Sequence, residues 1–85
     1  MVERELKRIT LQYFAVFQDQ AGCDRETVTT TASTPLSLYE ELRVRYAFPL
    51  SYQAVRVAVN DEFSAWETPL GDGDTVVFLA PVSGG

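Results

Sequence analysis

Alternation of apolar and polar positions dominates the start of the chain and predicts a half-buried strand from residue 9 to about residue 17. The polar segment 18–22 ends in glycine, which is typical of a turn. The β-branched run within 26–32 predicts a second strand, because such side chains suit a pleated surface. Two strands joined in this way indicate an antiparallel hairpin. One face of the first strand carries Ile9, Leu11 and Tyr13, and the other carries Thr10, Gln12 and Phe14.

Helical spacing follows the two strands. Leu38, Leu42 and Tyr46 recur every fourth residue, which predicts a helix of about ten to twelve residues with one apolar stripe. The pair Phe48-Pro49 ends it, because proline disfavours helical backbone angles in the residue before it.

The start of this helix has two interpretations. Ser37 with Glu40 three residues later matches a capping box, in which each side chain binds the other residue's backbone N–H. Thr34 as the cap would instead make Pro35 the first helical residue.

Alternation returns in the second half of the chain, at residues 54–59 and 75–80. The valines at 55, 57 and 59 share one face of the first segment, as do Val76 and Phe78 in the second. Between the two, residues 63–66 predict a short edge strand, with Trp66 packing at the sheet edge, and residues 69–74 are rich in turn formers. The faces opposite the valines and Phe78 carry Arg56, Ala58, Val77 and Leu79.

The order of elements predicts the fold class. With one helix, a mixed sheet of about five strands must bury its apolar face under that helix. The first and last strands are then natural parallel neighbours at the centre of the sheet. We therefore expect an α+β protein with the β-grasp (ubiquitin-like) arrangement over residues 9–80, between a flexible leader at 1–8 and a tail at 81–85.

Composition narrows the possible chemistry. Twelve acidic against seven basic residues give a net charge of −5, which disfavours nucleic-acid and anionic-membrane partners. Histidine is absent, and the single cysteine, Cys23, lacks both a thiol partner and an imidazole to activate it. Asp72 and Asp74 are better explained by a turn than by a cation site, so no metal is expected. This composition favours a cytoplasmic protein that is not an enzyme on its own.

The last two residues, Gly84 and Gly85, are the main functional signal. Glycine has no Cβ, so a backbone that ends in two glycines fits a narrow pocket of a partner protein. Pro81 limits the freedom of the tail at its root, which lowers the entropy lost on insertion. A terminal carboxyl group activated by adenylation would accept sulfur and become a thiocarboxylate. We expect Gly85 to be the reacting residue and Pro81, Val82, Ser83 and Gly84 to occupy the partner's channel.

One specific resemblance supports this interpretation. Residues 69–85, PLGDGDTVVFLAPVSGG, preceded by Val59-Asn60, are similar to the C-terminal signature of the molybdopterin synthase small-subunit family, a MoaD-type ubiquitin-like sulfur carrier. The segment 11–15 with the turn at Gly22 is similar to that family's opening strand.

The resemblance implies a reaction sequence and a set of partners. An adenylyltransferase of the ubiquitin-activating type converts Gly85 into an acyl-adenylate with ATP, and a sulfurtransferase system then makes the thiocarboxylate. The tail enters the large synthase subunit, in a heterotetramer, and its sulfur attacks cyclic pyranopterin monophosphate to build molybdopterin, the ligand of molybdenum. The chain itself binds no cofactor.

A docking surface is expected beside the tail, on the sheet face opposite the helix. An apolar patch with a polar rim is typical of a partner site. The residues predicted there are Phe14, Ala58, Val77 and Leu79, with Arg56 at the rim. Ordinary half-exposed strand residues, or a register shifted by one, are the competing explanations.

Three other functions fit the same sequence. The chain is alternatively a sulfur carrier for thiamine (thiazole) synthesis or tRNA thiolation, or a ubiquitin-like modifier that joins lysines through Gly85. The third is a β-grasp interaction module with an inert tail.

Overall fold

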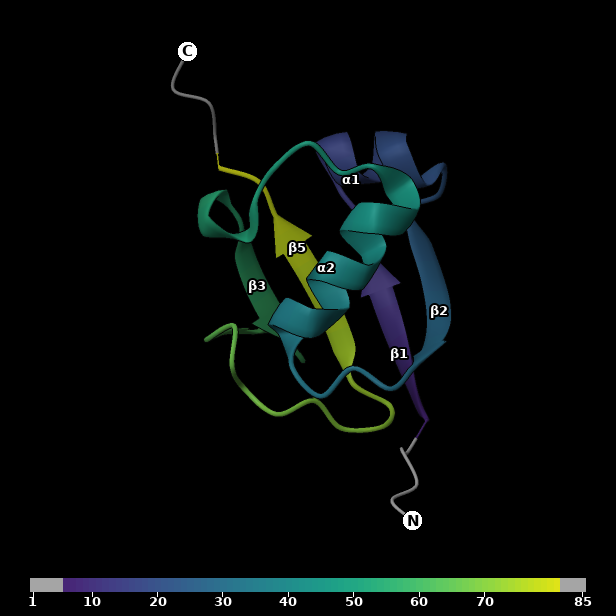
Figure 1. The fold of residues 1–85 in the computed structure, drawn as a ribbon, viewed down its shortest axis with the longest axis vertical. Helices are drawn as coiled ribbons and strands as arrows, with labels where there is room; N and C mark the ends of the chain where they lie inside the picture. Colours follow the sequence, from purple (N-terminus) through teal and green to yellow (C-terminus); the bar gives the residue numbers. More distant parts are fainter. Residues whose placement is uncertain (1–5, 82–85) are drawn as a thin grey trace.

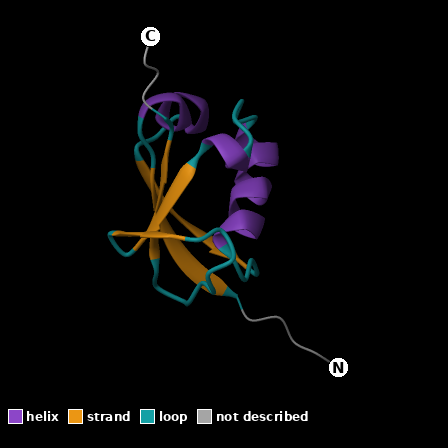
Figure 2. Cartoon of the chain, turned by 90° about the vertical axis from the view of Figure 1, so that its left-hand side faces the viewer, coloured by secondary structure: helices purple, strands orange, loops and turns teal. Residues whose placement is uncertain are grey.

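A computed structural model describes residues 6–81 of the chain and shows one mixed sheet with helices on one side (Figures 1 and 2). The strand order is β2-β1-β5-β3-β4. Strands β1 and β5 are parallel neighbours, whereas the β1–β2, β3–β5 and β3–β4 pairs are antiparallel. The elements are β1 (Lys7–Gln12), α1 (Ala15–Ala21), β2 (Arg25–Thr30), α2 (Pro35–Tyr46), the 3₁₀ turn η1 (Tyr52–Ala54), β3 (Arg56–Val59), β4 (Glu62–Ser64) and β5 (Thr75–Leu79).

This topology confirms the predicted α+β class and the β-grasp arrangement, with the first and last strands paired in parallel at the centre. Figure 2 shows α2 packed along one face of the sheet. Among residues 6–81, no helix covers the opposite face. Because β1 and β5 run in the same direction, β5 ends at the edge of the sheet where β1 also ends, far from the start of β1 (Figure 1).

The predicted long first strand is wrong beyond Gln12. The segment assigned to the end of that strand and to the following turn forms helix α1, so β1 and β2 are antiparallel but not joined by a tight hairpin. Phe17 is fully buried, and its ring centroid lies 5.0 Å from that of Phe48, so tertiary packing overrides the local alternation. Gly22 ends the helix with φ of 79° and donates its N–H to the carbonyl of Gln18. Glycine at this position marks a helix end as well as a turn.

Thr34, rather than Ser37, caps α2, so the second interpretation of the helix start is confirmed. Pro35 is the first helical residue, and Thr34 and Ser37 form a reciprocal capping box with N···O distances of 3.2 and 3.3 Å. The predicted apolar stripe is confirmed for Leu38 and Leu42, which are buried against the sheet.

The core fills the space between α2 and the sheet and is rich in aromatic rings. Tyr39 of α2 contacts Phe78 of β5 edge-to-face, with 4.9 Å between ring centroids. Trp66 stacks on the same Phe78 ring at 6.1 Å, so its predicted packing role is confirmed, but against the central strand β5. The edge strand predicted at 63–66 is instead β4, Glu62–Ser64, and ends before Trp66. The buried apolar residues of the strands are Ile9, Leu11, Val28, Val57, Val76 and Phe78.

The acidic turn before β5 fixes the register of the central strands. Asp72 accepts a hydrogen bond of 2.7 Å from the backbone N–H of Arg8, at the start of β1. Asp74 accepts from the Gly71 N–H at 2.8 Å and from the Asn60 side chain at 3.0 Å. Both carboxylates therefore serve the turn, as the sequence predicted.

Within residues 6–81, no helix is both long and apolar enough to cross a membrane.

Candidate partner-binding face

The open face of the sheet brings together four of the five residues predicted for partner binding. In the antiparallel β3–β5 pair, Ala58 lies opposite Val77, and Arg56 lies opposite Leu79. Directly paired residues share a face of the sheet, and their neighbours Val57, Val76 and Phe78 point into the core. The predicted alternation is thus confirmed: Arg56, Ala58, Val77 and Leu79 occupy the face without a helix.

Phe14 occupies a different place from the one predicted. It is not a strand residue but the N-cap of α1, in extended backbone two residues beyond the end of β1. Its side chain is 52% exposed. Since Gln12 is the parallel partner of Val77, Phe14 lies past the edge of the sheet at which β5 also ends.

Phe63 belongs to the open face and was not among the predicted interface residues. In the edge strand β4 it lies opposite Ala58, and its side chain is 65% exposed. A large aromatic residue between the polar residues Glu62 and Ser64 is a signal for such a face, although three residues are too few to fix their orientation from sequence. We call Ala58, Phe63, Val77 and Leu79, with Arg56 at their edge, the open-face patch.

A groove of about 750 Å³ extends from this patch to the end of β5. Arg56 and Phe63 line one part of the groove, and Leu79, Ala80 and Pro81 line the other. Pro81 is exposed and is the last described residue. The groove residues are Gln53, Ala54, Val55, Arg56, Phe63, Leu79, Ala80 and Pro81.

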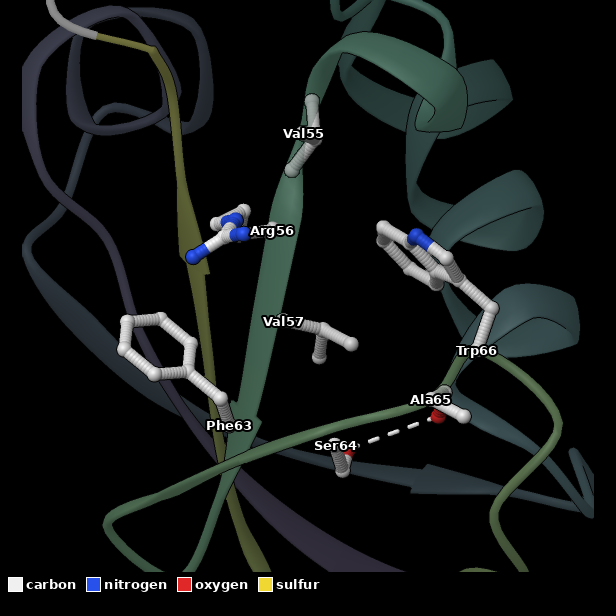
Figure 3. Close-up of a pocket in the computed structure, with 7 residues that line it drawn as sticks. All are labelled: Val55, Arg56, Val57, Phe63, Ser64, Ala65 and Trp66. Carbon is white, nitrogen blue, oxygen red and sulfur yellow. Dashed lines mark hydrogen bonds between the residues drawn. The ribbon is translucent and has the colours of Figure 1, made fainter.

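Arg56 is held over an aromatic ring. Its guanidinium carbon lies 5.3 Å from the centroid of Phe63, within the range of a cation–π contact. Figure 3 shows both side chains on one side of β3, while Val57 and Trp66 point to the other side, toward the core. A smaller cavity of about 350 Å³ is formed between these two groups of side chains at the β3–β4 edge.

The predicted reacting residue and most of its tail lie outside the described residues. Gly85 and the channel residues Val82, Ser83 and Gly84 are beyond residue 81, so of that group only Pro81 is placed by the structure. What the structure does place is the root of the tail. It follows directly from the central strand β5, beside the open-face patch.

The buried polar side chains of the domain serve its architecture. The Glu26 carboxylate accepts hydrogen bonds from the hydroxyls of Tyr13 at 2.5 Å and Tyr46 at 2.7 Å. Burial, together with the bond to Glu26, raises the pKa of Tyr13, and the bond to Glu26 raises the pKa of Tyr46. Burial raises the pKa of Tyr39 to about 12, and its hydroxyl donates to the Leu50 carbonyl at 2.6 Å.

The remaining reactive groups form no catalytic cluster. Cys23 is half-buried and packs against the core. In the described part of the chain, no three cysteine or acidic side chains gather in a way that would hold a metal ion.

Comparison with known proteins identifies the family. The model of the ThiS family matches residues 11–85, which includes every strand from β2 to β5 and the glycine pair. The chain belongs to the ThiS/MoaD family of sulfur carriers.

Members of the ThiS/MoaD family are small, non-catalytic carrier proteins, and two curated relatives span almost the whole chain. The molybdopterin synthase sulfur carrier subunit of Escherichia coli (strain K12) is 31% identical over 80 residues, covering 91% of this chain and 99% of the relative. The protein of the same name from Mycobacterium tuberculosis (strain ATCC 25618 / H37Rv) is 32% identical over 83 residues, covering 92% and 98%.

Solved structures of ThiS/MoaD-like proteins share the fold. The small archaeal modifier protein 1 of Methanosarcina acetivorans superposes with a TM-score of 0.76 at 20% identity, covering 95% of this chain and 99% of that one. A chain of the complex of subunits 1 and 2 of the molybdopterin-converting factor from Helicobacter pylori 26695 superposes with a TM-score of 0.61 at 24% identity, covering 92% and 99%. Family membership thus fixes the carrier role and leaves the pathway open.

Proposed function

We propose that this chain is the sulfur-carrier subunit of a molybdopterin synthase. One observation carries the proposal. Two curated relatives that match more than nine tenths of the chain, at 31% and 32% identity, are both molybdopterin synthase sulfur carrier subunits. The C-terminal stretch APVSGG and the turn GDGD, which the sequence analysis singled out, fall inside the family match.

The reacting group in this proposal is the α-carboxylate of Gly85. One of its oxygens attacks the α-phosphorus of ATP on an adenylyltransferase of the ubiquitin-activating type, which releases pyrophosphate and leaves an acyl-adenylate. Sulfur delivered by a sulfurtransferase then displaces AMP and gives the thiocarboxylate. Because adenylation converts a poor leaving group into a good one, the chain needs no catalytic side chain of its own.

The open-face patch is the proposed docking site for the partners of this reaction. The large synthase subunit would bind Ala58, Phe63, Val77 and Leu79 while residues 81–85 enter its active site, and cyclic pyranopterin monophosphate would receive the sulfur there. The Helicobacter pylori relative was solved in complex with a second subunit. We expect the assembly here to be a heterotetramer with two copies of each subunit. Phe14, at the same edge of the sheet as the end of β5, lies where it would extend this contact.

A second function has its own supporting observation. The archaeal modifier protein and the putative molybdopterin converting factor subunit 1 of Pyrococcus furiosus superpose about equally well, with TM-scores of 0.76 and 0.73. A modifier of this kind would transfer the activated Gly85 carbonyl to a lysine amine rather than accept sulfur. Carriers for thiamine synthesis or tRNA thiolation would share the thiocarboxylate and differ in the protein that receives it.

Intact-mass spectrometry tests the proposal directly. The full chain is coexpressed with the activating enzyme and sulfurtransferase of its own organism, and its mass is compared with that of the chain expressed alone. We expect an increase equal to the difference between one sulfur and one oxygen atom, located at Gly85 by fragmentation. The matched control carries one extra alanine after Gly85 and should show no increase.

Transfer to the substrate separates the pathways. The thiocarboxylated chain, mixed with the cognate large synthase subunit and cyclic pyranopterin monophosphate, should yield molybdopterin and return to the unmodified mass. A thiocarboxylate that forms but supports no molybdopterin would move the function to another sulfur pathway. A ladder of covalent conjugates on a denaturing gel would indicate a modifier instead.

A further inference from the structure

Arg56, at the edge of the open-face patch, has no ion-pair partner among residues 6–81. Between residues 6 and 81 the structure contains one ion pair, Arg43 with Glu40 on α2, so no carboxylate in that range neutralises Arg56. Arg56 also makes none of the side-chain hydrogen bonds found in this range. In a chain of net charge −5, a guanidinium without an ion pair at the edge of a candidate interface is a cation available to an acidic group of a partner.

The ring of Phe63 holds this guanidinium in place. The contact of 5.3 Å to the ring centroid limits the rotamers of a long side chain before any partner arrives. The acidic neighbour Glu62 alternates to the opposite face of β4, so it does not compete for the guanidinium. Pre-ordering of this kind reduces the entropy lost when the donors of Arg56 bind an acceptor.

The surroundings of Arg56 are apolar on the side of the tail. Leu79 lies directly opposite it across the β3–β5 pair, and Ala80 and Pro81 line the same groove. A partner that covers this groove would exclude water from the guanidinium. A charge pair formed there is stronger than one at an open surface, and an unpaired charge there is costly.

We infer that Arg56 is a specificity residue that receives a carboxylate from the partner protein, supplied by an aspartate or glutamate next to an apolar side chain that fills the groove beside Leu79. The inference rests on the proposed function, because it takes the docked partner to be the large synthase subunit. The planar guanidinium binds both oxygens of a carboxylate, whereas the neighbouring apolar wall accepts only an uncharged side chain. The Arg56–Phe63 pair would thus set the register in which the partner meets the root of the tail.

Binding of the full-length chain to the cognate large synthase subunit tests this inference by titration calorimetry at low and high ionic strength. Arg56→Ala should weaken binding about tenfold at low salt and should reduce the salt dependence of the dissociation constant. Arg56→Lys should recover only part of the affinity, since an ammonium lacks the planar fork. The matched control is Arg45→Ala on α2, which removes the same charge and a similar contact, 6.0 Å over Tyr46, on the covered side of the sheet. It should bind like the wild type.

A charge exchange identifies the acceptor. Arg56→Glu should abolish measurable binding, and changing one acidic residue of the partner to lysine should restore it. Circular dichroism of each variant checks folding, which the exposed position of Arg56 should leave intact. The inference is overturned if Arg56→Ala binds within twofold of the wild type, or if Arg56 instead drives self-association of the chain in sedimentation. If the wild-type chain itself fails to bind the large subunit, it is the proposed function that fails.

Discussion

The two faces of the central strand β5 differ in a way that separates stability from function. On the covered face, Val76 and Phe78 are fully buried under α2. On the open face, Val77 and Leu79 are half-exposed although they are equally apolar. The stability gained by burying Val76 and Phe78 explains why these two residues are apolar. The second pair has no covering element among residues 6–81, which is the property expected of a surface that a partner covers.

The same comparison bears on the proposed reactive tail, which follows β5. β5 lies between β1 and β3. β1 pairs with it from Thr75 to Val77, and β3 fixes the register of its last residues, Phe78 and Leu79. The hydrogen bonds of Asp72 and Asp74 at the other end of β5 anchor it against β1 and Asn60. A partner that binds the open face of β5 is therefore also in a defined position relative to residue 81.

The largest effect is expected from the covered face. Phe78→Ala removes a fully buried ring that touches Tyr39, Trp66 and Phe17, and should lower the free energy of unfolding by about 3–5 kcal/mol. Leu79→Ala, one residue later on the open face, is the matched control and should cost less than about 1 kcal/mol. Urea unfolding followed by circular dichroism measures both. Equal losses for the two variants would show that Leu79 belongs to the core.

Partner binding, in contrast to stability, should depend most on the open face of β5. Leu79→Asp places a charge in the centre of the open-face patch and should weaken binding to the large synthase subunit by at least about tenfold, because that carboxylate would be desolvated without a partner. Folding should remain within about 1 kcal/mol of the wild type. Thr27→Asp adds the same charge on the same face at the far strand β2, where Thr27 is exposed opposite Thr10.

Two results would contradict this second expectation. Loss of folding in Leu79→Asp, detected by circular dichroism, would assign Leu79 to the core. A similar loss of affinity in Thr27→Asp would show that the effect comes from net charge and not from the open-face patch.

How far the sequence predicts this molecule depends on whether short-range or long-range contacts decide a segment. Alternation in 75–80 places every β5 side chain correctly, because a strand packed on one face must repeat every second residue. Residues 14–17 are also compatible with a strand, and residues 18–22 with a turn, but Ala15–Ala21 form helix α1. This helix depends on the contacts of Phe17 with Phe48 and Tyr39, which no local pattern reveals.

The residues of the candidate site also divide into those predicted by the local pattern and those that depend on long-range contacts. The faces of Arg56, Ala58, Val77 and Leu79 follow from the alternation within each strand. The position of Phe63 depends on the pairing of β4 with β3, and that of Phe14 on β1 ending at Gln12, and neither can be read from the local sequence. The Arg56–Phe63 contact joins two strands and therefore could not be predicted from the local sequence pattern. Gly85 as the reacting residue stays a prediction from the sequence; it falls within the family match and lies beyond the described residues.

The smallest effect in this comparison is a pH dependence confined to the covered side. Burial raises the pKa of Tyr39 to about 12 from 10.0, so above pH 10 the unfolded chain loses this proton before the folded chain does. The stabilisation is complete below pH 10 and is lost as the pH rises toward 12, which amounts to about 1 kcal/mol for this tyrosine at pH 11. Unfolding free energies at pH 8 and 11 measure the loss, and Tyr39→Phe should reduce it. Tyr52→Phe, at a partly buried tyrosine of η1 whose ring packs against Trp66, is the matched variant for the loss of one phenol hydroxyl. An alkaline loss that is identical in the wild type and in Tyr39→Phe would show that the phenol under α2 does not couple its proton to folding.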